Sequence, residues 1–212
     1  MPVPATAPEG RSSAPPGVRS RRVAARRAEL LEAAVRVIRR EGDRVAMEDI
    51  AAEAGISRPI LYRHFGGTDG LYGAVARRFN EELGARLARP GRVPQGRALL
   101  HRQVSTFLGF VAEDPNVYRF LVRRSPRHRA TGGRSGFSLL VSARTVDFLE
   151  AAGWDRPAAV VAADLLVGGL EAVADRWLDE PQGSVDEVAE TMTALVWSGL
   201  AAMAHAADRR GR

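Results

Sequence analysis

The stretch MEDIAAEAGISRPILYRHF, residues 47–65, concentrates the side chains best suited to bind a partner. Its second half, taken as a helix, leaves one polar or projecting set of residues: Arg58, Pro59, Tyr62, Arg63 and His64. A helix with such a face can donate hydrogen bonds to phosphates and to base edges when it lies in the major groove of DNA. These residues are therefore the candidate binding surface.

The sequence carries little that suggests an enzyme. It has no cysteine, which excludes disulfides, thiolate metal sites and cysteine nucleophiles. The four histidines, at positions 64, 101, 128 and 205, lack the spacing of metal ligands, and no strand precedes a glycine-rich phosphate loop. We expect no catalytic residues, no metal and no cofactor. Turnover of a substrate by the purified protein would establish the enzyme alternative.

Two short helices and a tight turn must position the polar set. On the first helix Ile50 and Ala51 face inward, and Ala51 is small enough to let the second helix cross closely. Gly55 suits a turn that needs a positive φ, and Ile56 fills the corner. Ser57 is placed to cap the second helix. This pattern indicates a helix-turn-helix, although an ordinary helical hairpin has the same spacing.

Helical periodicity elsewhere predicts an all-α fold with about nine helices and no strands. The first helix carries Leu30 to Ile38 and ends near Gly42. The later helices are expected at 47–54, then through 65, 68–89, 95–112, 117–124, 137–152, 156–179 and 184–206. The N-caps are expected at Thr68, Asp114 and Asp155, with a Ser184–Glu187 capping box. The domains follow: a disordered tail at 1–18, a head at 19–67 and a helical body at 68–212.

The charge is unevenly distributed over the 212 residues. The net charge is +6 and every basic residue is arginine, yet residues 153–212 carry ten acidic residues against five arginines. The excess of arginine therefore lies in residues 1–152, which favours a polyanionic partner for that part of the chain. A solvated surface explains the charge equally well. The longest apolar run is interrupted by Asp164, so we expect no membrane association and a cytoplasmic protein.

Residues 22–75 resemble the N-terminal domain of the TetR family of transcriptional regulators. The matching segments are the Leu30–Ile38 stripe, IAAEAGIS, LYRHF and the glycine-rich link to Leu71 and Tyr72. The resemblance implies a homodimer with three-helix DNA-binding heads and a helical body that binds a ligand. Double-stranded DNA is then the partner, and two-fold symmetry predicts a pseudo-palindromic operator.

The resemblance also implies roles for single residues. Tyr62 and His64 match positions that bind operator phosphates, whereas Arg58, Pro59 and Arg63 match positions that face bases. An arginine can pair with both O6 and N7 of guanine, so the two arginines are the candidates for specificity. A phosphate contact is the other interpretation of Arg63.

Three features depart from the family pattern. Thr68 stands where many members have a lysine, although the amide end of the following helix can still face a phosphate. Ala46 replaces a usual hydroxyl residue, and the link from Gly42 to Met47 is one residue short. Arginines at 19, 21, 22, 26 and 27 form either a phosphate-binding arm or a solvated tail.

The last two expected helices are rich in small and apolar residues. In TetR-like proteins they form the dimer seam, which here is expected to use Ala162, Leu165, Gly169, Val188, Met192, Leu195 and Gly199. The alternative is packing within one subunit.

A hydrophobic small-molecule effector is expected in the body. The candidate pocket residues are Phe107, Phe110, Tyr118, Leu121, Phe148, Leu166 and Leu170, although aromatic residues also serve as ordinary core. Parts of the body look similar to actinobacterial TetR-like regulators of lipid metabolism, which implies a fatty acyl effector. The stretch Arg119–Arg134 has six arginines and no acid; it suits the phosphates of an acyl carrier, a solvated loop or flanking DNA.

Two further functions remain open at this level. One is a helical lipid-binding protein, and the other is a nonspecific architectural DNA binder. A discrete protected palindrome in footprinting favours the regulator, whereas uniform coating favours the architectural protein.

Overall fold

The computed structural model describes residues 16–88, 96–124 and 135–210, with side chains from 21 to 199 within those ranges. The described residues contain no strand, which confirms the expected all-α fold. They form nine α-helices and one 3-10 turn: α1 (Pro16–Glu41), η1 (Gly42–Arg44), α2 (Met47–Glu53), α3 (Arg58–Phe65), α4 (Thr68–Leu87), α5 (Arg97–Glu113), α6 (Pro115–Arg123), α7 (Gly136–Ala151), α8 (Arg156–Asp179) and α9 (Val185–Arg210).

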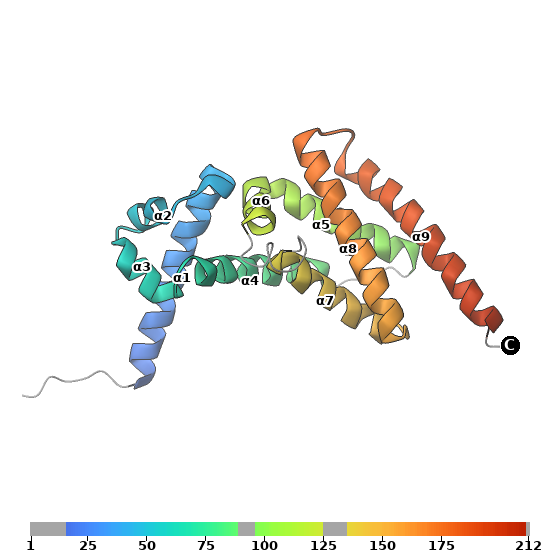
Figure 1. Ribbon diagram of the computed structural model, residues 1–212, viewed down its shortest axis with the longest axis horizontal. Coiled ribbons are helices and arrows are strands. Elements are labelled where there is room, and N and C mark those ends of the chain that lie inside the picture. Colours follow the sequence, from blue (N-terminus) through green and yellow to red (C-terminus); the bar gives the residue numbers. More distant parts are fainter. Residues whose placement is uncertain (1–15, 89–95, 125–134, 211–212) are drawn as a thin grey trace, which may run out of the picture.

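The first three helices form a head at one end of the molecule, and α4 runs from it into the body (Figure 1). Helix α4 contacts α1 and α3 of the head and α5, α6 and α7 of the body. One continuous hydrophobic core therefore joins head and body. Its fully buried members include Leu30, Ile38 and Leu61 from the head and Val75 and Leu108 from α4 and α5.

The body is built from two helix pairs. Helix α7 packs along α8, and α5 packs along α9. Helices α8 and α9 are joined at one end and diverge toward the other (Figure 1). A small second core lies between α7 and α8 and contains Val146, Leu149, Ala159, Ala162 and Ala163. The faces of α8 and α9 that these pairs do not use remain open.

Two of the expected helix caps are present. The Asp155 carboxylate accepts a hydrogen bond from the Ala158 amide at 2.8 Å, which confirms its cap on α8. Ser184 and Glu187 form the reciprocal capping box of α9, with bonds of 2.7 and 3.2 Å. Both motifs join residues three positions apart, so local sequence determines them.

The other three expected caps make no capping bond, although Ser57 and Asp114 occupy the predicted N-cap positions. Ser57 lies at the N-cap of α3 but its side chain makes no capping bond, and Thr68 is the first residue of α4 because Gly67 is the N-cap. Asp114 lies at the N-cap of α6 without capping it. Its carboxylate binds Arg39 of α1 instead.

The expected tail needs one correction. Helix α1 begins at Pro16, so residues 16–18 are helical rather than part of the tail. The other fifteen tail residues lie outside the described residues, as do residues 125–134 of the arginine-rich stretch.

Candidate nucleic-acid interface

The turn between α2 and α3 has the predicted geometry. Gly55 adopts φ +63°, and a side chain at this position would meet no neighbouring atom, so the backbone conformation alone favours glycine. The Ile56 amide donates to the Ala51 carbonyl at 3.0 Å, which closes the turn. Ile50 and Ala51 are buried beneath it. This arrangement fixes the angle at which α3 leaves the head.

Helix α3 has one face in the core and one face toward solvent. Leu61 and Phe65 are buried, and Ile60 is half-buried. The outward residues are the predicted ones: Arg58, Pro59 and Arg63 are exposed, and Tyr62 and His64 are half-buried. Thr68 is exposed at the start of α4. The six candidate residues therefore lie on an accessible part of the head.

Arg58 is held by two neighbours. Its guanidinium pairs with the Glu48 carboxylate of α2, donates to the Tyr62 hydroxyl at 3.0 Å and lies 5.2 Å from the Tyr62 ring centroid. A hydrogen bond with Thr68 lowers the pKa of Tyr62, and the hydrogen bond from Arg58 lowers it further. The sequence reasoning missed Glu48, which precedes Arg58 by ten residues on a separate helix. Arg63, in contrast, has no ion pair or hydrogen bond with the described part of the chain.

The junction of α3 and α4 is unusually close. A Cβ atom at Gly70 would lie 1.7 Å from the Phe65 carbonyl oxygen, so only glycine fits there. The first turn of α4 thus lies directly against the end of α3, and it brings Thr68 next to Tyr62. Two candidate phosphate-binding groups are thereby grouped at one edge of the head.

The start of α2 and the arginine-rich part of α1 show further detail. Ala46 has no hydroxyl, but its amide donates to the Asp49 carboxylate at 3.1 Å, so α2 keeps half of a capping box. Arg26 pairs with Glu29 at 2.7 Å, and the Arg27 guanidinium lies 5.2 Å from the Phe65 ring centroid. These two arginines are partly engaged within the head, while Arg22 is exposed.

The predicted apolar pocket does not form as a single enclosure. Phe107 and Tyr118 meet edge to face at 6.3 Å in the core, where Phe110 and Leu121 are also buried. Burial raises the pKa of Tyr118. Phe148 is 51% exposed, so the structure contradicts its place in an enclosed pocket. The remaining two residues, Leu166 and Leu170, are half-buried on α8.

A cavity of about 610 Å³ lies beside α5 instead, and its lining is mostly polar. Of the predicted pocket residues only Phe110 lines it. The sequence pattern showed which side chains are apolar but could not show where packing leaves a void.

Most of the predicted dimer residues are accessible. Leu165 and Leu195 are 74% and 73% exposed, Gly169 and Gly199 are exposed, and Val188 and Met192 are half-buried. The prediction for Ala162 is corrected, because this residue is buried against α7 within the subunit rather than accessible for a dimer contact. Val161 on α8 is also exposed, which the sequence reasoning missed.

Two observations bear on other partners. Among the described helices, α8 is long and apolar enough to cross a membrane by length and composition alone. No group of three metal-ligating side chains occurs within the described ranges.

Comparisons with known proteins cover both parts of the chain. The family model described as "Bacterial regulatory proteins, tetR family" matches residues 30–75, and "Tetracyclin repressor-like, C-terminal domain" matches residues 97–199. An uncharacterized HTH-type transcriptional regulator of Mycobacterium tuberculosis is 29% identical over 186 residues, which cover 85% of this chain and 80% of the relative.

Solved structures show the same similarity. A TetR-like transcriptional regulator from Rhodococcus sp. RHA1 is 33% identical, with a TM-score of 0.59, 83% of this chain covered and 96% of the other. A tetR-family regulator from Streptomyces coelicolor is 28% identical, with a TM-score of 0.63 and coverage of 87% and 84%.

Proposed function

Because the chain belongs to the TetR family of bacterial transcriptional regulators, we propose that it is a homodimeric repressor that binds a pseudo-palindromic operator. The observation that carries the proposal is the outward face of α3. This face presents Arg58, Tyr62 and Arg63 on a helix whose angle is fixed by the turn at Gly55. In a dimer the two copies of α3 would enter successive major grooves.

The proposed contacts differ in kind. Arg63 reads a base, because its guanidinium is exposed. It has no partner in the described part of the chain, so binding to DNA breaks no existing contact. Tyr62, His64 and the amide end of α4 at Thr68 bind phosphates, which position the head without reading sequence. Arg58 also faces a base once its guanidinium leaves the Glu48 carboxylate and contacts DNA.

The dimer is proposed to form through α8 and α9. Two leucines that are three-quarters exposed, Leu165 and Leu195, are costly to leave in water, and the neighbouring Gly169 and Gly199 allow a second helix to approach. A dimer interface on this face also accounts for the apolar character of α8 without a membrane.

An effector is proposed to act from the body, in a protein that works in the cytoplasm. The proposed effector is a hydrophobic small molecule of the fatty acyl class, in keeping with the apolar character of the body's helices. Its binding must favour one arrangement of the two heads over another in order to release DNA.

Footprinting of the purified protein on DNA fragments tests the proposal. Protection of a discrete pair of inverted half-sites is the expected result. Uniform protection along the fragment would instead identify an architectural DNA binder, and absence of protection would favour a helical lipid-binding protein.

A further inference from the structure

The cavity beside α5 is lined by charged and hydroxyl side chains over an aromatic floor. One face of α5 contributes Arg102, Ser105, Thr106, Phe110 and Glu113, and α4 contributes Arg86. Its volume of about 610 Å³ lies in the range of small-molecule sites. The site therefore has room for a small organic ligand.

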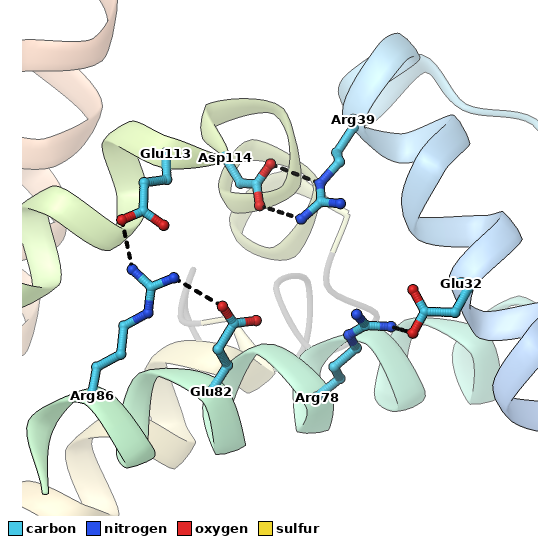
Figure 2. Close-up of polar contacts among 7 residues, drawn as sticks. All are labelled: Glu32, Arg39, Arg78, Glu82, Arg86, Glu113 and Asp114. Carbon is cyan, nitrogen blue, oxygen red and sulfur yellow. Dashed lines mark hydrogen bonds and ion pairs between the residues drawn. The ribbon is translucent and has the colours of Figure 1, made fainter. Parts of the chain in front are cut away.

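The two arginines of this cavity differ in their partners. The Arg86 guanidinium lies 4.9 Å from the Phe110 ring centroid and donates to Glu113 at 2.7 Å and to Glu82 at 2.9 Å (Figure 2). Arg102 has no carboxylate within ion-pair distance in the described ranges. Glu113 is the one carboxylate among the described residues that line the cavity. An added anion would thus meet one guanidinium with no carboxylate partner in the described ranges, and it would compete with both Glu113 and Glu82 for the other.

We propose that this cavity binds an organic anion, with its carboxylate between Arg102 and Arg86. Guanidinium groups bind carboxylates through paired, charge-assisted hydrogen bonds, and the Ser105 and Thr106 hydroxyls supply further donors. The inference rests on the proposed regulator and names its effector class: a free acid rather than a thioester or an alcohol.

The position of Glu113 links the cavity to the DNA-binding head. Glu113 ends α5, and the next residue, Asp114, binds Arg39 of α1 through two hydrogen bonds (Figure 2). The Asn116 amide donates to the Arg39 carbonyl at 2.7 Å. A ligand that draws Arg86 away from Glu113 removes a contact that holds the end of α5. The change reaches α1 through the bond between Asp114 and Arg39.

Calorimetry on the DNA-free protein tests the site directly. The probes are decanoate and decanol, together with benzoate and benzyl alcohol, so that each acid has an uncharged partner with the same apolar body. At least one acid should bind more tightly than its alcohol. Arg102→Ala should weaken that acid about tenfold and leave the alcohol nearly unchanged. Glu113→Gln should tighten the acid severalfold, because Arg86 loses one of its two competing carboxylates.

Arg77→Ala is the matched control, since it removes an exposed arginine from α4 outside the cavity. It should leave all affinities unchanged. The proposal is overturned if no acid binds better than its alcohol, or if Arg102→Ala and Arg77→Ala behave alike. Loss of DNA binding by the protein would contradict the proposed function but not this site, because the calorimetry contains no DNA.

Discussion

Asp114 accepts two hydrogen bonds from the Arg39 guanidinium, at 2.8 and 2.7 Å, although the residues are 75 positions apart. This bond raises the pKa of Arg39. The pair joins the end of α1 in the head to the α5–α6 corner of the body. It is therefore a specific polar restraint on the angle between the two parts.

Replacing Asp114 tests this restraint. Asp114→Ala should lower the free energy of unfolding by about 1 kcal/mol or less, because the pair is partly solvated. Hydrogen exchange at the end of α1 should accelerate at the same time. The control Glu41→Ala breaks a surface pair with Arg40 that does not reach the body. Equal exchange rates in the two variants would show that Asp114 does not restrain α1.

The ion pair between Glu48 and Arg58 predicts a gain of DNA affinity on mutation. Glu48→Gln should tighten operator binding severalfold, because Arg58 no longer exchanges a carboxylate for DNA and a negative charge leaves the interface. Fluorescence anisotropy at two salt concentrations measures the effect. Glu41→Gln removes the same charge from the far end of α1 and should have less effect. Unchanged or weaker binding by Glu48→Gln would contradict a DNA-facing Arg58.

The exposed leucines predict the effect of charge on assembly. Leu165→Glu or Leu195→Glu should convert the dimer to a monomer, since each places a carboxylate in an apolar contact that dimerisation would bury. Sedimentation velocity reports the oligomeric state. Ala52→Glu changes an exposed residue of the head and should leave the dimer intact. A dimer that survives both leucine substitutions would place the interface elsewhere.

The bond between Arg86 and Glu113 predicts a small dependence of stability on pH. The hydrogen bond from Arg86 holds the pKa of Glu113 below its usual range. The bond's contribution to the free energy of unfolding is complete above the unfolded-state pKa of about 4.3. It is lost as the pH falls through the lower folded-state pKa of Glu113. Wild type should therefore be more stable than Glu113→Gln at pH 7, and the difference should vanish at strongly acidic pH. Urea unfolding measures both proteins; a difference that persists in acid would exclude this pair as the cause.

The head was predictable from sequence because its determinants are local. Gly55, Ala51 and Leu61 lie within eleven positions of one another, and their spacing alone specified the turn and the buried face. The capping box of Ser184 and Glu187 was predictable for the same reason. Such short-range patterns restrict the backbone before any long-range packing.

The polar links and the cavity could not be predicted in this way. Asp114 has the spacing of a helix cap, but tertiary packing brings Arg39 close enough to take its carboxylate. Phe148 has the character of a pocket residue, yet its place on α7 faces outward. Periodicity identifies which side chains leave water, whereas the position of a void depends on how whole helices cross.

Selection of binding sites from random DNA, with wild type and Arg63→Ala in parallel, tests the central claim most directly. Wild type should select two inverted half-sites at a fixed spacing. Arg63→Ala should keep that spacing, lose the preference at one position per half-site and cost about 1–3 kcal/mol on the wild-type site. Tyr62→Phe should weaken all sequences alike. An unchanged preference profile in Arg63→Ala, or the absence of inverted half-sites in wild type, would contradict the account.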